Sequence, residues 1–266
     1  MSDHNTKKKL LVSNDDGYES YFLRHLVNAL VKDFDVYVVA PLAEQSWVGR
    51  AMSRSGVLQA RPLQDWPCPA WAVSGRPADC VNIGLNHLMP ERPDAVVSGI
   101  NLGFNVSLPL TLSSGTVAAA TEGALAGLPA LAFSLAIPRE EFMSVSKARG
   151  QRDEAGNRLT QIAAEHARKM TLKILEEEQQ PYTVHNINFP PLITADAQCV
   201  ASTMTIGQMP SLFAPLEASP EGYQQFSFAF ATDWTHTYKP SHADIEVLNQ
   251  GKISHTTLQW DQLSKS

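Results

Sequence analysis

An acidic pair near the N-terminus is the first place in the sequence where chemistry could occur. The apolar run 10–13 leads directly into Asn14, Asp15, Asp16 and Gly17. Adjacent carboxylates repel each other, so water or a bound cation must offset their charge. Asp-Asp-Gly by itself is most common as a solvated turn, because Asp and Gly tolerate turn geometry. The pair therefore leaves both interpretations open until the rest of the chain is considered.

Three further polar clusters have ordinary structural explanations as well as chemical ones. Ser46 is typical of a helix cap or a loop, Asn101 of a left-handed turn, and the run 113–116 of a helix N-cap. Helix N-termini also bind phosphate, since their unpaired N–H groups and the helix dipole point outward. Each cluster alone is weak support for a functional site.

The expected secondary structure brings these clusters to one edge of a sheet. Short buried runs separated by helices are typical of parallel βαβ units, which predicts a doubly wound, mostly parallel, Rossmann-like α/β fold. We expect strands at 10–13, 35–41, 94–99 and 130–135, and helices at 21–32, 77–89 and 115–127. Ligands of such sheets bind beyond the carboxyl ends of the strands. The clusters follow those ends or begin the next helix, so we expect them to converge.

The second half of the chain has weaker patterns. Residues 139–157 are charged and aperiodic, which indicates an exposed loop, and a long helix and a strand at 182–190 follow. Beyond residue 195 the pattern is strand-like, with Phe226, Phe228 and Phe230 alternating, and residues 245–260 predict a helix, a turn and a final strand. We predict a single domain over 1–266, with a core of about 7–195 and a C-terminal hairpin or arm of about 196–266.

Composition excludes several classes of protein. The 266 residues are 44% hydrophobic and 18% charged, as in ordinary globular proteins, and the formal net charge is −6. An acidic chain lacks the basic face that binds duplex nucleic acid or an anionic membrane, although it is compatible with a small phosphorylated ligand. Cys68, Cys80 and Cys199 lack zinc-site spacing, and no segment resembles a signal peptide or a membrane span. We expect a soluble cytoplasmic protein.

The converging side chains are hard oxygen ligands. The carboxylates of Asp15 and Asp16, the hydroxyl of Ser46 and the amide of Asn101 suit Mg²⁺, Mn²⁺ or Ca²⁺ better than zinc. The sequence has no dinucleotide-binding, P-loop or G-x-S-x-G motif. A phosphatase of the haloacid-dehalogenase type needs D-x-D spacing, which adjacent aspartates do not provide. A non-catalytic module that binds phosphate or a cation is the rival from another class.

Several segments together resemble the SurE family of metal-dependent nucleotidases and acid phosphatases. The resemblance extends over nearly the whole chain, and its N-terminal segments are highly specific. The segments are "LLVSNDDG" (10–17), "VYVVAPLAEQSWVG" (36–49), "SGRPADCVNIGL" (74–85), "PDAVVSGINLGFN" (93–105), "SSGTVAAATEGALAGLPALAFSL" (113–135) and, more weakly, "VHNINFP" (184–190).

The resemblance implies both an activity and an architecture. It implies hydrolysis of nucleoside monophosphates, at the 5′ or 3′ position, to nucleoside and phosphate. It implies an extended hairpin and a C-terminal arm used in oligomers, and hence a homodimer or homotetramer. One divalent cation per subunit (Mg²⁺ or Mn²⁺, or else Ca²⁺) would be held by Asp15, Asp16, Ser46 and Asn101.

A mechanism follows as a hypothesis. Asp15 or Asp16 accepts a proton from the attacking water, and the residues alone do not decide which of them does so. Backbone and side-chain N–H groups then hold the phosphate oxygens as charge shifts in the transition state. The residues expected to contact the phosphate are Asn14, Asn105, Ser114, Gly115 and Thr116.

The chain departs from the family pattern at the rim of the expected site. Trp47 stands where the family usually has Gly, Arg50 where it often has His, and Arg76 where Thr is common. After Asp-Asp-Gly, residues 18–22 replace the usual Ala-Pro-Gly turn. None of these changes removes an expected metal ligand, so they bear on substrate preference. A catalytically weakened family member that only binds phosphate and a cation is the alternative.

Overall fold

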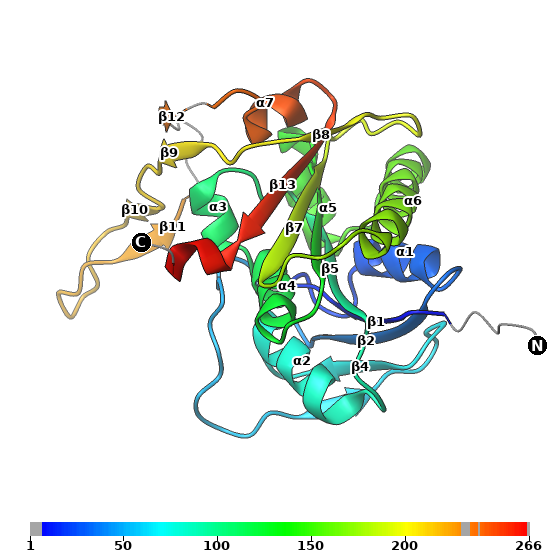
Figure 1. The fold of residues 1–266 in the computed structure, drawn as a ribbon. Coiled ribbons are helices and arrows are strands. Elements are labelled where there is room, and N and C mark those ends of the chain that lie inside the picture. The colour runs from blue at the N-terminus through cyan, green and yellow to red at the C-terminus, as the bar shows by residue number, and fades with distance from the viewer. Residues whose placement is uncertain (1–6, 230–234, 239, 265–266) are drawn as a thin grey trace, which may run out of the picture.

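A nine-stranded sheet forms the centre of the computed structural model (Figure 1), which describes residues 7–229, 235–238 and 240–264. The strand order is β3-β4-β2-β1-β5-β6-β7-β13-β8. The strands of this sheet are β1 (Lys9–Ser13), β2 (Asp35–Pro41), β3 (Ala60–Pro62), β4 (Ala70–Val73), β5 (Ala95–Leu102), β6 (Ala130–Leu135), β7 (Thr183–Phe189), β8 (Cys199–Ala201) and β13 (Ile253–Gln259).

The direction in which the chain crosses the sheet reverses between β1 and β5. From β1 the chain proceeds to β2 and β4 on one side, whereas β5 lies on the other side of β1 and is followed by β6 and β7. Strand β1 is parallel to both neighbours, and Ser13 at its end pairs with Ser98. Ligands of doubly wound sheets bind at such a switch point. The topology therefore directs attention to the carboxyl ends of β1 and β5.

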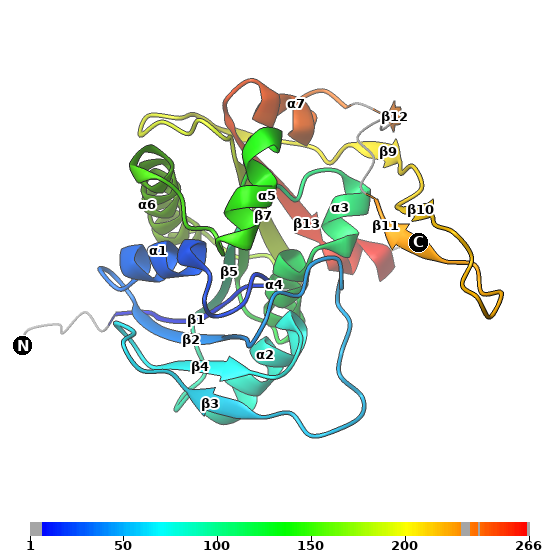
Figure 2. The same ribbon diagram turned by 180° about the vertical axis from the view of Figure 1, so that it is seen from behind.

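Helices cover both faces of the sheet (Figures 1 and 2). One face packs on α1 (Tyr21–Leu30) and α6 (Glu154–Glu176), and the other packs on α2 (Pro77–Ile83), its π-helical continuation η1 (Gly84–Leu88) and α4 (Gly115–Leu125). Side chains alternate along a strand, so Leu10 and Val12 of β1 face α1, whereas Leu11 faces α2. Strands buried on both faces explain the continuous apolar runs in the sequence.

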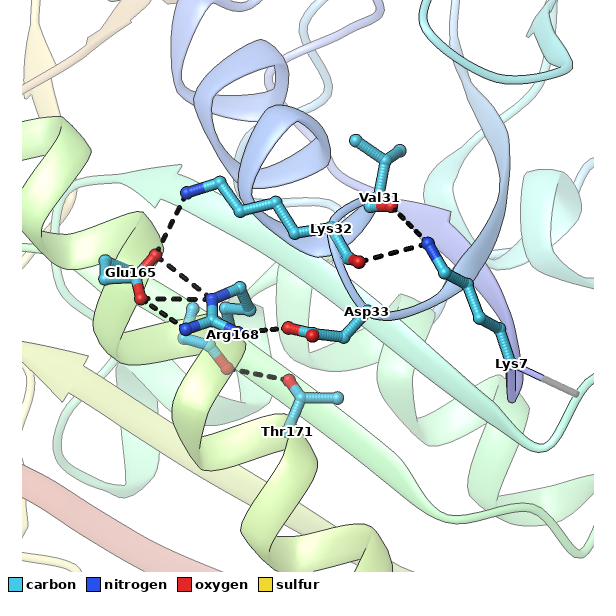
Figure 3. A network of polar contacts seen from close by, with 8 residues as sticks. Lys7, Val31, Lys32, Asp33, Glu165, Arg168 and Thr171 are labelled. Carbon is cyan, nitrogen blue, oxygen red and sulfur yellow. Dashed lines mark hydrogen bonds and ion pairs between the residues drawn. The ribbon is translucent and has the colours of Figure 1, made fainter. Parts of the chain in front are cut away.

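A polar network joins α1 to α6 (Figure 3). Arg168 of α6 pairs with Asp33, just beyond α1, and contacts Glu165 at 2.5 Å. Lys32 reaches the same Glu165 at 3.3 Å. The hydrogen bond from Arg168 lowers the pKa of Glu165 to about 2. The network holds the two helices together at the surface, while Phe22 and Leu26 of α1 are fully buried beneath it.

The charged segment after β6 is exposed as expected, but most of it is helical rather than a loop, and only residues 148–153 lack helical structure. Helix α5 (Arg139–Lys147) carries Glu140 and Glu141 in its first turn and a lysine in its last. This charge order complements the helix dipole. Val145 is the only residue of α5 that is buried. A single inward-facing apolar residue leaves no periodic pattern to detect, which is why the helix escapes sequence analysis.

The C-terminal part of the chain divides between the main sheet and a projecting arm. Helix α7 (Asp244–Asn249) leads into β13, which pairs with β7 and β8, and η2 (Trp260–Ser264) follows. Two short antiparallel pairs project beyond the sheet (Figure 1). They are β9 (Ile206–Gln208) with β12 (Thr235–Tyr238), and β10 (Phe213–Pro215) with β11 (Phe226–Phe228). We call the described residues of β9–β12 and their connections the arm.

These elements confirm the doubly wound, mostly parallel α/β class with a projecting hairpin. The expected boundary near residue 195 is less sharp than the sequence suggested, because β8 and β13 lie beyond it and still extend the main sheet. Of the alternating phenylalanines, Phe226 and Phe228 lie in β11, and Phe230 lies outside the described residues.

Candidate active site

The acidic pair lies in a tight turn at the carboxyl end of the central strand β1. The side-chain amide of Asn14 donates to the Gly17 carbonyl at 2.9 Å and closes the turn. Asn14 is fully buried, and its Oδ1 has no hydrogen-bond partner within the described chain. Its expected contact with phosphate stays a prediction, since one amide proton is already used in the turn.

Asp15 is packed against the N-terminus of α4. The hydroxyl of Thr116 donates to Asp15 Oδ1 at 2.5 Å, and Asp15 is only 4% exposed. A Cβ on Gly115 would lie 2.7 Å from the Cβ of Asp15, so only glycine permits this approach. Burial raises the pKa of Asp15 to about 6, although the Thr116 donors oppose the rise. The positive end of the helix dipole thus faces a carboxylate.

Asp16, which is half-buried, completes the acidic pair. Its Oδ2 accepts a hydrogen bond from the Leu102 N–H at 2.9 Å, which ties the turn to the end of β5. Burial and the neighbouring Asp15 raise the pKa of Asp16 well above its usual range. Within the described residues, neither carboxylate forms an ion pair with lysine or arginine. One buried and one half-buried carboxylate without a basic partner form a site that a cation would stabilise.

Ser46 lies at the rim, on a loop that connects the acidic turn to α4. The N–H of Gln45 donates to the Asp15 carbonyl at 2.7 Å, and the N–H of Gly49 donates to the Ser113 carbonyl at 2.9 Å. Ser46 is exposed, and its own N–H donates to Glu44. The loop is therefore fixed at both ends, and Ser46 lies next to the residue that bonds Asp15.

Asn101 lies within β5 rather than in a turn after it. The expected strand ends at residue 99, but β5 continues to Leu102 after a register shift between Ser98 and Asn101. The Asn101 amide donates to the Gly103 carbonyl at 3.0 Å, and the residue is 9% exposed. This places Asn101 one residue before Leu102, whose N–H binds Asp16.

Asn105 belongs to a buried polar network that the sequence did not reveal. Its side-chain amide donates to Ser134 Oγ at 2.9 Å, and its N–H donates to Asn188 Oδ1 at 2.7 Å. Its carbonyl accepts from Asn186 at 2.8 Å. Asn186 and Asn188 lie on β7, where alternating asparagines in a buried strand were the available signal. The network fixes the loop between β5 and α3 (Leu108–Ser113).

The helix N-terminus expected to contact phosphate is present beside the acidic pair. Ser114 is the N-cap of α4, and its hydroxyl accepts from the Val117 N–H at 3.1 Å. N–H groups in the first turn of a helix have no acceptor within the helix. The hydroxyl of Thr116 donates to Asp15, so any contact of Thr116 with phosphate would be made by its backbone N–H, and this contact stays a prediction. Hydrogen bonds thus join the acidic pair to the start of α4, to the end of β5 and to the residue before Ser46. Asn105 is bonded instead to Ser134 and to the asparagines of β7, and its contact with phosphate stays a prediction.

The donor set fits a hard divalent cation. No three His, Cys, Asp or Glu side chains gather as a metal site in the described part of the chain. A cation here would therefore be held by two carboxylates together with neutral oxygens, as the set of Asp15, Asp16, Ser46 and Asn101 provides. Such all-oxygen sets suit Mg²⁺, Mn²⁺ or Ca²⁺.

The rim residues that depart from the family pattern have structural partners. Arg50 pairs with Glu122 of α4 at 2.7 Å, and Arg76 donates to the Met52 carbonyl at 3.0 Å. Trp47 is 37% exposed, has a φ of 62°, and its ring lies 5.4 Å from that of Phe228. A cavity of about 280 Å³ is lined by Glu122, among others, but not by the acidic pair.

Fold and site together define a doubly wound α/β protein with an acidic pair at the switch point of its sheet. Residues 10–209 match the family described as "Survival protein SurE". The chain belongs to this family, as the resemblance of its motifs had implied.

Relatives and a solved structure agree with this assignment. A "5'-nucleotidase SurE" of Maridesulfovibrio salexigens is 33% identical over 95% of this chain and 93% of its own length. One of Syntrophus aciditrophicus is 38% identical over 95% of this chain and 88% of its own. The crystal structure of the SurE protein from Aquifex aeolicus superposes with a TM-score of 0.68 at 26% identity, covering 94% of this chain and 93% of that one. No helix among the described residues is long and apolar enough to cross a membrane.

Proposed function

We propose that this chain is a metal-dependent nucleotidase that hydrolyses nucleoside monophosphates to a nucleoside and inorganic phosphate. The observation that carries the proposal is the acidic pair beside the N-terminus of α4, in which Asp15 is buried and Asp16 is half-buried. Curated relatives that match most of this chain are named 5'-nucleotidases. A phosphoric monoester is the substrate class that such a site suits, because it needs both a cation and N–H donors.

Asp15, Asp16, Ser46 and Asn101 would hold one divalent cation, with Mg²⁺ or Mn²⁺ favoured and Ca²⁺ a further candidate. When bound, such a cation supplies charge neutralisation for the phosphoryl oxygens and lowers the pKa of a coordinated water. The acidic pair, in which Asp15 is buried and neither carboxylate has a lysine or arginine partner within the described residues, supports this assignment. Asn14 Oδ1, which lacks a partner within the described chain, is a further oxygen near the same turn.

The protein's own groups would position the phosphate and move one proton. The first-turn N–H groups of α4, at Ser114, Gly115 and Thr116, would bind the non-bridging oxygens, and the helix dipole would favour the negative charge. The amide of Asn105 would bind the same group, held in place by the asparagines of β7. Asp16 is our candidate for the general base, because the donors of Thr116 stabilise Asp15 as a carboxylate ligand.

The test is phosphate release from a panel of nucleoside monophosphates in EDTA, Mg²⁺, Mn²⁺ or Ca²⁺. Asp15→Asn and Asp16→Asn keep the side-chain shape and remove the charge. We expect each to lower kcat/KM at least about a hundredfold, the size of losing one transition-state contact. Asp65→Asn, in an exposed loop, is the matched control and should retain activity.

Two results would overturn the proposal. Activity of Asp15→Asn and Asp16→Asn within a few-fold of the wild type would exclude the acidic pair from the reaction. If the metal-loaded wild-type protein releases phosphate from none of the monophosphates, the result would instead favour a weakened family member that binds phosphate and a cation without catalysis.

We also propose a homodimer or homotetramer in the cytoplasm. The aromatic face of the arm supports self-association, since Phe213, Phe226 and Phe228 are 58%, 62% and 50% exposed. Cys68, Cys80 and Cys199 are free thiols, as suits a reducing compartment.

A further inference from the structure

Trp47 lies midway along the loop that joins the two halves of the candidate site. Two residues before it, the N–H of Gln45 bonds the carbonyl of Asp15 at 2.7 Å. Two residues after it, the N–H of Gly49 bonds the carbonyl of Ser113 at 2.9 Å, one residue before the N-cap of α4. Figure 2 shows this segment after β2 rising to α3 before it descends to β3. The backbone of Trp47 is thus held on a loop that is fixed to the acidic turn at one end and to the expected phosphate-binding turn at the other.

The backbone of Trp47 has a conformation that bulky residues rarely adopt. Its φ of 62° lies in the left-handed region, where glycine fits without strain. The neighbouring Gly49 also has a positive φ of 52°, and a Cβ there would lie 2.9 Å from the Leu112 carbonyl oxygen. The chain therefore keeps a large aromatic side chain at a position where the backbone favours glycine. This cost indicates that the side chain itself has a use.

Aromatic residues of the arm hold the indole without covering it. The Phe228 ring meets the Trp47 ring at 5.4 Å in an edge arrangement with an interplanar angle of 61°. Phe228 in turn meets Phe213 at 6.1 Å, also edge-on. Edge contacts of this kind are favourable and orient a ring. Trp47 still exposes 37% of its surface, so part of the indole faces solvent beside the site.

We propose that Trp47, oriented by Phe228, stacks on the nucleobase of the substrate and makes this enzyme prefer nucleotides over base-free sugar phosphates. The proposal rests on the proposed nucleotidase function and adds the part of the substrate that the acidic pair and α4 do not contact. Stacking on an aromatic ring is available to every base, because each has a π face. Purines offer the larger face, so purine monophosphates are the favoured class.

The experiment compares AMP with ribose 5-phosphate, which carries the phosphate and sugar but no base. Trp47→Gly suits the positive φ and should preserve the loop. We expect it to lower the ratio of kcat/KM for AMP to that for ribose 5-phosphate about tenfold. Trp47→Phe should keep most of the ratio, and Phe228→Ala should lower it in the same direction. Tyr223→Ala removes an exposed arm aromatic outside these ring contacts and is the matched control.

Each result decides between stacking and another role. An unchanged ratio in Trp47→Gly overturns the proposal, and so does an equal loss on both substrates, because Trp47 would then act through its loop. A change of oligomeric state in Trp47→Gly, measured by light scattering, would assign the ring to a subunit interface and also overturn it. If the wild type hydrolyses both substrates equally well, the stacking proposal is refuted, whereas the proposed phosphatase activity is supported.

If the wild type hydrolyses neither substrate, the proposed function is refuted instead. Calorimetric titration with AMP then still tests whether the Trp47 ring binds the base. Weaker binding in Trp47→Gly with unchanged binding in Tyr223→Ala supports stacking, and equal binding in all three proteins refutes it.

Discussion

At the scale of single residues, the hydroxyl of Thr116 determines the environment of Asp15. Both residues are buried, and their hydrogen bond is 2.5 Å long. A buried carboxylate that loses such a donor keeps its desolvation cost without compensation. The contact links residues 101 positions apart in the sequence, the two ends of the candidate site.

Thr116→Val should weaken the binding of the divalent cation. Valine has nearly the shape of threonine but cannot donate, so Asp15 becomes a poorer carboxylate ligand. We expect the cation concentration for half-maximal activity to rise about tenfold. Thr116→Ser, which keeps the hydroxyl, should stay within about threefold of the wild type. Equal cation dependence of the two variants would contradict this role of the hydroxyl.

The sequence directs attention to the residues of the candidate site, but it does not predict their contacts with one another. Asp15, Asp16 and Ser114 attract attention because acidic and capping residues directly follow apolar runs or begin a helix. The bond from Thr116 to Asp15 depends on how closely α4 approaches β1, which Gly115 permits and no local pattern encodes. The alternation of Asn186 and Asn188 in an apolar strand indicates buried amides, but their partner Asn105 is distant in the sequence and has no local signal.

At the scale of elements, a histidine pair joins β7 to β13. His185 Nδ1 lies 2.9 Å from His255 Nε2, and His185 Nε2 lies 3.2 Å from Gln179 Oε1. If His185 donates to Gln179, then His255 donates to His185, and both rings are neutral. Burial and the neighbouring His255 lower the pKa of His185 to about 4, and burial lowers that of His255.

The histidine pair should make the fold less stable in mild acid. Histidines in the unfolded chain take up protons below about pH 6.5, whereas the folded pair resists protonation until lower pH. The free energy of unfolding should therefore fall as pH drops from about 6.5 towards 4, by up to about 1.4 kcal/mol per pH unit for each proton. Urea titrations at several pH values test this prediction. In the double variant His185→Gln/His255→Gln, the free energy of unfolding should depend less on pH. An identical slope in this variant would exclude the pair as the cause.

Asp244 connects three elements through one buried carboxylate. It accepts from the Ser107 N–H at 2.7 Å and from the Thr205 N–H and hydroxyl at 3.0 and 2.6 Å. It also accepts from the Ile245 N–H at 2.8 Å and is 1% exposed. The carboxylate thereby joins the loop after Asn105, the base of the arm and the start of α7.

Asp244→Asn should destabilise the protein by about 3 kcal/mol, because an amide cannot accept all of these bonds and the donors are buried. Chemical denaturation followed by circular dichroism measures the change. Glu217→Gln, an exposed acid-to-amide change on the arm, should stay within about 0.5 kcal/mol of the wild type. A loss below about 1 kcal/mol for Asp244→Asn would show that the joined segments hold together without it.

Elements with a strong pattern were predictable, and elements held by distant contacts were not. Strands β1, β2 and β6 and helix α1 follow from apolar periodicity and lie where expected. Helix α5 buries only Val145, so no apolar period in the sequence predicts it. The pairing of β13 with β7 depends on contacts between distant segments, and no local sequence pattern predicts it.

At the scale of the whole molecule, the arm leaves an aromatic face uncovered. In β10 and β11, Phe213 pairs with Phe228 and Pro215 with Phe226, which puts these side chains on one face. An isolated two-stranded pair is marginally stable in water, so it needs a covering surface. A second copy of the chain would provide one.

Replacing both Phe213 and Phe226 with serine should therefore shift the protein towards monomer. Sedimentation or light scattering at decreasing concentration measures this shift. Leu192→Ser, at a residue that is 72% exposed and outside the arm, is the control and should leave the assembly unchanged. A wild type that is already monomeric at high concentration would refute the proposed self-association.

The strand order has a consequence for synthesis on the ribosome. The acidic turn, its loop and the start of α4 all lie before residue 117, so the candidate site is translated before β7 and β13. Strand β13 lies between β7 and β8 in the sheet but follows both of them in the sequence. Until β13 emerges from the ribosome, β7 presents an unpaired edge, and unpaired edges promote aggregation. A nascent chain should therefore depend most on chaperones during the interval between the synthesis of β7 and that of β13.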